Sequence, residues 1–164
     1  MKRRTMNLKE IEVHFGEVEY RNLKRGWVKI TNDFESKHMV TAKLPFVKPR
    51  YLHKKILPAL RKALELIEKK CPYDSRYEYI EVLQIFAPRH IGNNRARRLS
   101  CHTWGIAFDI NPVDNMPGDS DYTIPSYIVD IFESVGFTWG GRFSSKDYMH
   151  FEPSRTFFDF TSKW

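Results

Sequence analysis

The chain has 164 residues, of which 41% are hydrophobic, 15% aromatic and 29% charged. This composition argues against a disordered tail and fits one globular domain, which at this length buries enough surface to fold without disulfide bonds. The formal net charge is +7, and no run of residues approaches the roughly 18 apolar residues that a membrane span needs.

Two features bear on the compartment of the protein. The two cysteines, Cys71 and Cys101, are too few for a disulfide framework and indicate a reducing compartment, although a single bridge between them stays open. The basic residues 2–4 are followed by polar residues where the apolar segment of an export signal would lie. We therefore expect no signal peptide.

The positive charge is concentrated in the first half of the chain. Residues 1–70 contain 18 Lys or Arg against 8 Asp or Glu, whereas residues 71–164 contain 9 against 12. A basic surface attracts polyanions such as nucleic acid, an acidic membrane or an anionic cell-wall polymer, or is simply a solvated face. No nucleic-acid-binding motif accompanies the charge, so nucleic acid is the least favoured of these partners.

The first 50 residues are expected to form irregular structure with short strands. Short apolar segments at 11–15, 27–30 and 39–46 are separated by glycine and proline residues. Residues 1–70 resemble no known wall-binding module, so their role is open. We therefore treat residues 1–50 as an N-terminal extension of unclear role within a chain that forms one compact unit.

The next elements are a helix and a strand. Over residues 51–70 the apolar positions recur every three or four residues, which predicts an amphipathic helix. Pro58 either kinks this helix or marks its first turn. Residues 79–87 then alternate between apolar and polar, which predicts a strand, and a loop rich in arginine and asparagine follows.

The last third of the chain predicts two strands separated by a helix. Residues 105–110 alternate, with Asp109 on the face opposite the apolar residues. A helix is expected to begin near Thr123 and to end at Gly136, and a final strand covers 148–152. Separated strands mixed with helices favour an α+β fold over a wound parallel sheet.

Two histidines and an aspartate form a candidate metal site. His102, Asp109 and His150 supply two imidazole nitrogens and one carboxylate oxygen, which leaves the fourth tetrahedral position to water, as a hydrolytic zinc requires. Gly105 and Ala107 lie on the same face as Asp109 and leave room for a metal and a substrate backbone.

The segment around His150 also supplies a candidate base. Strand alternation places His150 and Glu152 on one face. Asp147, three residues before His150, can reach the water at the metal, accept its proton and pass the proton to the leaving amine. Glu152 then orients an imidazole, and Arg89 can hold a substrate carboxylate or the oxyanion.

Simpler interpretations apply to the other candidate ligands. Cys101 is adjacent to His102 and its thiolate could compete for a metal, but neighbouring residues in an extended segment point in opposite directions. A purely structural metal site would use four protein ligands, and no convincing fourth is present. The four remaining histidines are expected to be ordinary core or surface residues: His14, His38, His53 and His90.

Two motifs carry a resemblance to a known family. Ser-x-His-x-x-Gly-x-Ala-x-Asp at residues 100–109 and Asp-x-Met-His-Phe-Glu at residues 147–152 resemble the zinc D,D-carboxypeptidase and L-alanyl-D-glutamate endopeptidase family (peptidase family M15). This family includes bacteriophage endolysins, and the resemblance covers about residues 80–155. It implies a small antiparallel sheet flanked by helices, a fold of the Hedgehog and D,D-peptidase type.

The resemblance also implies roles for individual residues. The two histidines and the aspartate above would bind Zn²⁺, and Asp147 would be the general base. Arg89 would stabilise the transition state, and Ser100 would hydrogen-bond near the substrate. Residues 51–164 would form the zinc peptidase catalytic domain.

The function implied by this resemblance is hydrolysis of an amide bond in peptidoglycan stem peptides. We expect an L-alanyl-D-glutamate endopeptidase of the phage or prophage lysin type, because no export signal is found and wall lysis needs an internal cut. D-alanyl-D-alanine carboxypeptidase activity is the alternative. A non-catalytic wall-binding or phage structural module is the alternative of another class.

Expected partners and location follow from the same function. The substrate is the peptidoglycan stem peptide, and the basic first half of the chain could bind an anionic wall polymer. We expect no membrane span, no nucleic-acid partner and a monomer. Such an enzyme would stay in the host cytoplasm until release, or would be carried by the virion.

Overall fold

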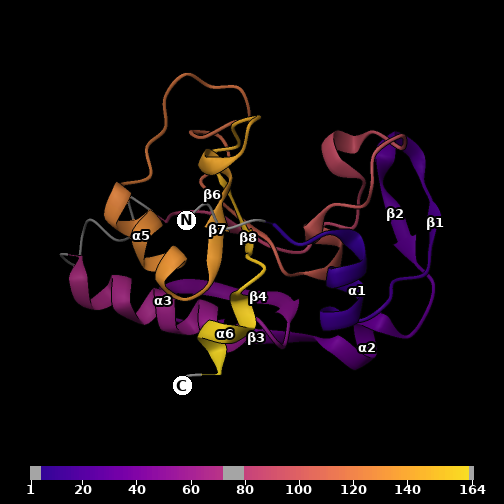
Figure 1. Cartoon of the computed structure of the whole chain (residues 1–164), viewed down its shortest axis with the longest axis horizontal. Coiled ribbons are helices and arrows are strands. Elements are labelled where there is room, and N and C mark those ends of the chain that lie inside the picture. Colours follow the sequence, from indigo (N-terminus) through magenta and orange to yellow (C-terminus); the bar gives the residue numbers. More distant parts are fainter. Residues whose placement is uncertain (1–4, 72–79, 163–164) are drawn as a thin grey trace.

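The computed structural model describes residues 5–71 and 80–162, so residue 79, where one strand was expected to begin, lies outside the described residues. In chain order, the helices and strands are α1 (Leu8–Phe15), β1 (Tyr20–Asn22), β2 (Val28–Ile30), α2 (Phe34–His38), β3 (Met39–Leu44), β4 (Val47–His53), α3 (Leu57–Lys70), β5 (Leu83–Gln84), β6 (Phe108–Ile110), α5 (Ser126–Ser134), β7 (Phe137–Trp139), β8 (His150–Pro153) and α6 (Phe157–Thr161) (Figure 1). The strand pairs of the described residues are antiparallel. The expected α+β class is therefore confirmed.

A four-stranded sheet in the order β5–β6–β8–β7 lies at the centre of the fold (Figure 1). In its register, Asp109 on β6 lies opposite both Gln84 on β5 and His150 on β8. Directly opposed residues point to the same face of a sheet, so these three side chains share one face. Phe108 and Phe151 point to the other face, where their rings stack with centroids 5.3 Å apart.

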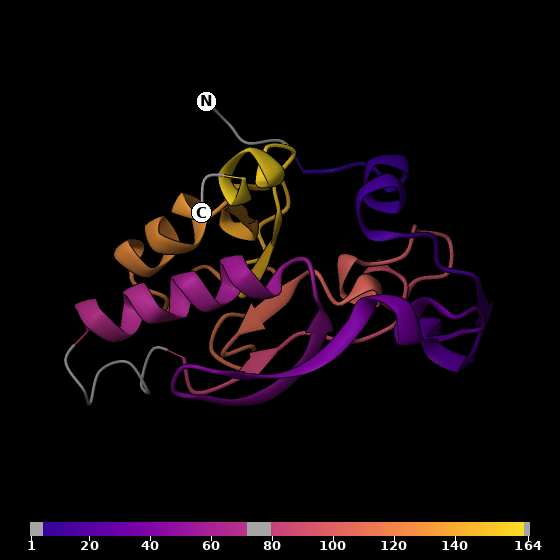
Figure 2. The ribbon, with the colours of Figure 1, turned by 90° about the horizontal axis from the view of Figure 1, so that it is seen from below.

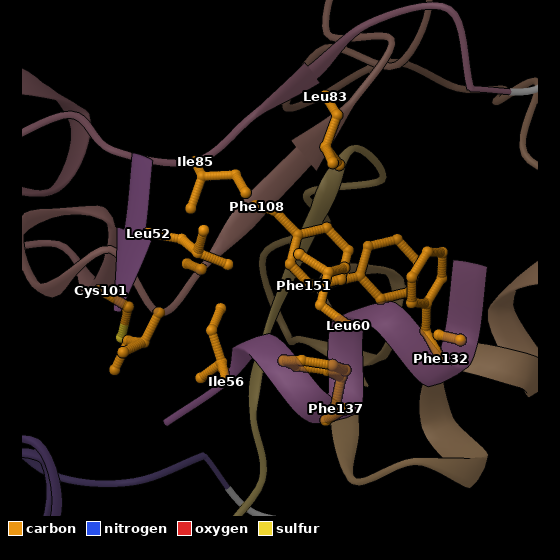
Figure 3. Close-up of a cluster of buried hydrophobic side chains, with 14 of the residues drawn as sticks. Leu52, Ile56, Leu60, Leu83, Ile85, Cys101, Phe108, Phe132, Phe137 and Phe151 are labelled. Carbon is orange, nitrogen blue, oxygen red and sulfur yellow. The ribbon is translucent and has the colours of Figure 1, made fainter. Parts of the chain in front are cut away.

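The hydrophobic core lies between this second face and the helices α3 and α5, which run side by side in Figure 2. Phe132 of α5 packs against Phe108 and Phe151, with ring centroids 5.0 and 4.9 Å away (Figure 3). Each fully buried Leu, Ile or Phe contributes about 1.5–3 kcal/mol relative to an exposed one. The apolar stripe of α3 is fully buried and consists of Ala59, Leu60, Ala63, Leu64 and Ile67.

Helix α3 is shorter at its amino end than the helix expected over 51–70. It begins at Leu57, and Pro58 lies in its first turn without a kink. Residues 51–53 instead belong to β4, which forms an antiparallel hairpin with β3. Backbone groups that are paired in a hairpin cannot also form a helical turn. The expected division of the chain after residue 50 falls within this hairpin and stays a prediction.

The first 50 residues contain short strands, as expected, but also helix α1, where irregular structure was expected. Asn7 and Glu10 form a capping box, in which each side chain accepts a hydrogen bond from the other residue's backbone N–H, at 2.9 and 2.7 Å. Ile11 and Phe15, four residues apart, then lie on one face and are fully buried. The Asn-x-x-Glu pattern before an apolar segment is the sequence signal for this helix start.

Three later elements are present but shorter than expected. Of the described residues 80–87 in the expected strand, only β5 is a strand, and beyond it the backbone N–H of Ala87 donates to the carbonyl of His102 at 3.2 Å. The strand expected over 105–110 is reduced to β6, because Gly105 adopts a left-handed φ of 62°. Likewise α5 begins at Ser126 rather than near Thr123, after Pro125 in an extended conformation. Among the described residues, no helix has both the length and the apolar character to cross a membrane.

The carboxyl end of α1 is hydrogen-bonded to two side chains from later in the sequence. The indole Nε1 of Trp104 donates to the carbonyl of Gly16 at 2.9 Å, and the Nε2 of His53 donates to the carbonyl of Phe15 at 2.9 Å. These two bonds occupy carbonyls that a helix end leaves without an intrahelical partner. The Trp104 bond ties α1 to the turn that carries His102, and the His53 bond ties α1 to the end of β4.

His53 is expected to make the fold sensitive to acid. It is fully buried, its Nδ1 accepts a hydrogen bond from the backbone of Lys55, and burial lowers its pKa to about 4. The nearby His38, Lys54 and Lys55 disfavour its charged form further. The unfolded chain binds a proton at this histidine below about pH 6.5, so His53 should lower the stability as the pH falls from about 6.5 to 4, by at most about 3 kcal/mol.

Urea unfolding of the wild type and of His53→Gln at pH 7 and pH 4 checks this expectation. The variant keeps an N–H donor for the Phe15 carbonyl but does not titrate. Between pH 7 and pH 4, the free energy of unfolding should fall further for the wild type than for the variant. A difference that stays the same at both pH values would contradict the prediction.

A small hairpin formed by β1 and β2 holds the loop that follows β5. Trp27 forms an antiparallel bridge with Arg89, and the backbone N–H of His90 donates to the carbonyl of Gly26 at 2.9 Å. Gly26 has φ +73°, and a Cβ atom there would lie 2.1 Å from the carbonyl oxygen of Asn93. Only glycine therefore allows the hairpin and the loop to approach this closely.

Candidate metal centre

Three structural elements bring the candidate ligands together. His102 lies in a short 3-10 helix (Cys101–Trp104), whose N-cap is Ser100, while Asp109 lies on β6 and His150 on β8. The hydroxyl of Ser100 accepts a hydrogen bond from the backbone N–H of His102 at 3.4 Å. Gly105 ends the short helix, and a Cβ there would lie 2.4 Å from the Met39 side chain.

The three ligand atoms form a nearly equilateral triangle. The Nε2 of His102 lies 3.1 Å from the Oδ1 of Asp109 and 3.2 Å from the Nδ1 of His150, and the last two atoms are 3.1 Å apart. All three residues are buried, and they form a group that could hold a metal ion. Ligands about 2.0–2.1 Å from a tetrahedral zinc lie about 3.3 Å from one another, so the triangle has the size of a zinc site.

The hydrogen bonds behind the triangle decide where the lone pairs point. The Nδ1 of His102 donates to the carbonyl of Ile85 at 2.7 Å, and the Nε2 of His150 donates to the Oε2 of Glu152 at 3.0 Å. When the two rings are neutral, as in metal ligands, each turns its unprotonated nitrogen toward the carboxylate of Asp109. Three acceptor atoms facing one another repel unless a cation lies between them.

The charges of the site agree with this requirement. Burial alone would lower the pKa of His150, but its hydrogen bonds with Asp109 and Glu152 raise the pKa to about 10. Although burial opposes them, the hydrogen bonds of the histidines lower the pKa of both carboxylates. A proton thus supplies the missing positive charge, and a metal ion has to displace it.

Asp147 lies with the three ligands along a cleft of about 1480 Å³. Among the described residues its Oδ1 is buried and accepts no hydrogen bond. Burial, and secondarily the Asp109 charge, raises the pKa of Asp147 against the opposing effects of His150, His102 and Arg89. A buried carboxylate oxygen that accepts no hydrogen bond from the protein can accept one from a water molecule, as a general base must.

The backbone of Asp147 is held by Gly140. The N–H of Asp147 donates to the carbonyl of Gly140 at 3.2 Å, and the N–H of His150 donates to the carbonyl of Asp147 at 3.2 Å. A Cβ at Gly140 would lie 2.2 Å from the Asp147 carbonyl oxygen. This close approach fixes Asp147 relative to the ligand His150.

Arg89 and Ser100 line the same cleft. The Arg89 carbonyl accepts hydrogen bonds from the N–H of Ser100 at 2.9 Å and from the hydroxyl of Thr103 at 3.1 Å, so its backbone is tied to both ends of the short helix that carries His102. The structure thus brings all six expected site residues to one cleft. Their roles there stay predictions.

The comparison with protein families matches the part of the chain that carries most of the expected site residues. Residues 93–153 match the family model described as D-alanyl-D-alanine carboxypeptidase. The resemblance to peptidase family M15 is confirmed. Neither the curated proteins nor the solved structures include a match to the chain. Together with the buried His–Asp–His group, the family match supports a metallopeptidase.

The M15 match covers some of the expected site residues and leaves one out. The triangle of ligand atoms, Asp147 and Ser100 lie within residues 93–153, whereas Arg89 lies before them. Arg89 lines the cleft and forms a backbone bridge with Trp27, which also lies outside the M15 segment. The position of Arg89 therefore rests on the structure rather than on the family match.

Cys101 is a site neighbour whose contact the sequence did not predict. It is a free thiol buried in the core next to Leu52 and Ile56 (Figure 3), and it is not in the group that could hold a metal. Its side chain hydrogen-bonds Glu152, and burial, together with the charge of Glu152, raises the pKa of the thiol well above its usual range. Cys101 thus supports the carboxylate that orients His150.

Replacing Glu152 with glutamine is expected to weaken metal binding. The carboxylate fixes the ring of His150 and strengthens it as a ligand, and loss of such a partner typically costs about 10- to 100-fold in metal affinity. Zinc dissociation constants from a competing chelator measure this loss. The control Glu133→Gln, a carboxylate in the same cleft that pairs with Arg142, should bind zinc like the wild type. Equal affinities for the two variants would contradict the prediction.

Proposed function

We propose that this protein is a zinc metallopeptidase that hydrolyses an amide bond in peptidoglycan stem peptides. The observation that carries the proposal is the triangle of three ligand atoms, 3.1–3.2 Å on each side, beside the cleft. His102, Asp109 and His150 would hold the metal. Two nitrogens and one oxygen at this spacing suit zinc and leave its fourth position open, as in catalytic sites.

The residues around the metal would each have a separate role in the hydrolysis. Zinc bound there would supply a Lewis acid that polarises the scissile carbonyl and lowers the pKa of water. Asp147 takes a proton from the attacking water as the C–O bond forms and gives it to the leaving amine nitrogen as the C–N bond breaks. Arg89 holds the negative charge that develops on the carbonyl oxygen, or a substrate carboxylate beside it.

Within this function, we favour cleavage between L-alanine and D-glutamate, as in a phage or prophage lysin. The family description favours a second candidate, removal of the terminal D-alanine. Ser100 would hydrogen-bond near the substrate. Its hydroxyl also accepts a hydrogen bond from the backbone N–H of the metal ligand His102. The basic first half of the chain would draw the enzyme to an anionic wall polymer.

Mass spectrometry of purified peptidoglycan after incubation with the zinc-loaded protein tests the proposal. A chelator-treated sample and the Asp147→Asn variant are the controls. New fragments that appear only with the zinc-loaded wild type would support the enzyme, and their masses would show which bond is cut. If zinc is bound but walls of several chemotypes release no fragments, the non-catalytic wall-binding module becomes the better interpretation.

A further inference from the structure

The cleft continues on the other side of the metal centre. A second hollow of about 840 Å³ shares Arg89, His102 and Asp109 with the first cleft. The first cleft extends over β8, where His150 lies, whereas the second extends over β5, where Gln84 lies beside Asp109 on the same face. Because β6 lies between β5 and β8, an extended substrate can cross the metal centre and contact both hollows.

The second hollow is lined by aromatic and apolar side chains, and we name it the apolar arm. Trp27 lines this hollow and keeps 42% of its surface exposed. A large apolar side chain that is exposed at the edge of a cleft is a candidate contact for a ligand. Tyr51 and Phe86 form an edge-to-face pair with centroids 5.2 Å apart. The guanidinium of Arg50 also lines this arm, but it donates to three backbone carbonyls, including that of Leu83.

The first cleft has the opposite character, and its part lined by Arg97 and Arg98 is named the basic arm. Two other arginines of this cleft are neutralised, because Arg142 pairs with Glu133 and Arg155 pairs with Glu10. Among the residues that the structure describes, Arg97 and Arg98 have no carboxylate within ion-pair distance. The guanidinium of Arg98 donates to the Leu99 carbonyl at 3.1 Å and to the Cys101 thiol at 3.9 Å, which leaves Arg97 as the arginine of this arm available to a carboxylate of the substrate.

We infer that the substrate lies across the metal centre with an uncharged sugar-bearing acyl side on the apolar arm and a carboxylate-bearing leaving side on the basic arm. This inference rests on the proposed function. In a stem peptide, muramic acid and L-alanine precede the L-alanyl-D-glutamate bond and carry no free carboxylate, whereas D-glutamate and later residues do. At the terminal D-alanine bond the leaving D-alanine also carries a carboxylate, but the acyl side then carries the carboxylates of the earlier residues. The two bonds therefore differ in the charge of the acyl side.

The chemistry of the apolar arm fits the ring of the muramic acid. An aromatic side chain can cover the C–H face of a sugar while the hydroxyl groups remain in water, and this burial of apolar surface is favourable. Trp27 and Tyr51 come from the part of the chain before the M15 segment. The first half of the chain would thus recognise the sugar next to the bond that the second half cuts.

Two matched substrates test the inference. One is N-acetylmuramoyl-L-alanyl-D-glutamyl-lysine, and the other is the same tripeptide with an acetyl group in place of the sugar. The wild type should cleave the sugar-bearing substrate with the higher kcat/KM, by about three- to tenfold, the range of one good aromatic contact. Trp27→Ala should remove this preference. The ratio of the two kcat/KM values of one protein does not depend on the fraction of that protein that is folded. Val113 is exposed and lies outside both arms, so Val113→Ala should keep the wild-type ratio.

The basic arm is tested with Arg97→Gln. This variant should lose more activity on the D-glutamate substrate than on its D-isoglutamine form, in which an amide replaces the α-carboxylate. Equal losses on both would overturn the assignment of this arm. A wild-type preference that Trp27→Ala keeps, or no preference at all, would overturn the substrate orientation while leaving the peptidase intact. Release of terminal D-alanine alone from the purified peptidoglycan would do the same. No hydrolysis of any substrate would instead refute the proposed function.

Discussion

Replacing Asp147 with asparagine is expected to lower kcat by about 10²- to 10⁴-fold, the usual effect of losing a general base. Asparagine keeps the size of the side chain but cannot accept a proton from water at neutral pH. The Oδ1 of Asp147 contacts no donor within the described part of the chain, so the substitution should break no hydrogen bond of this atom. Zinc affinity, measured with a competing chelator, should therefore stay close to that of the wild type.

A carboxylate from the same cleft supplies the control for this experiment. Asp130 lies on α5 and also lines the cleft, but it is exposed and is not part of the ligand triangle. Asp130→Asn removes the same charge and should retain most of the activity. Full turnover by Asp147→Asn would show that another group moves the proton.

Loss of one ligand from the triangle is expected to have the second large effect. His150→Ala removes one of three ligand atoms and leaves Asp109 and Glu152 without their shared hydrogen-bond partner. Both zinc binding and hydrolysis should fall to background, since two protein ligands do not make a zinc site. Treating the wild type with a chelator should give the same loss, and added zinc should restore activity only to the wild type.

His14 offers a matched histidine for comparison. Its ring stacks on Phe158, with centroids 4.7 Å apart, and it is not in the group that could hold a metal. His14→Ala should keep both the bound zinc, measured by metal analysis of the purified protein, and the activity. If His150→Ala retains chelator-sensitive hydrolysis, the triangle is not the catalytic metal site.

Local sequence patterns and the family motifs together were sufficient to select the three candidate ligands that the structure brings together. His102 and Asp109 lie seven residues apart across one tight turn, and His150 lies on a strand whose alternation is visible in the sequence. The family motifs join these two segments although 48 residues separate the histidines. The contacts behind the ligands were only partly predictable. Strand alternation indicated that Glu152 lies on the same face as His150, but no local pattern indicated that the Ile85 carbonyl accepts a hydrogen bond from His102.

The first half of the chain shows where local patterns fail. Capping by Asn7 is local, but the burial of Phe15 depends on residues far along the chain, among them Phe157, whose ring centroid lies 6.4 Å away. The elements α2, β7 and α6 were not predicted, because three to five residues carry too little periodicity. The bridge between Trp27 and Arg89 is likewise set by tertiary packing, so the sequence could not show that the first half reaches the cleft.

The close approach of Gly26 to Asn93 has a consequence for redesign of this protein. The hairpin and the loop meet backbone to backbone, so Trp27 and Arg89 are parts of one rigid unit. A transplanted hairpin with a different tip could change what the enzyme recognises, but it would have to keep a glycine at this crossing. Otherwise the exchange would also displace the arginine, and altered selectivity would come with slower turnover.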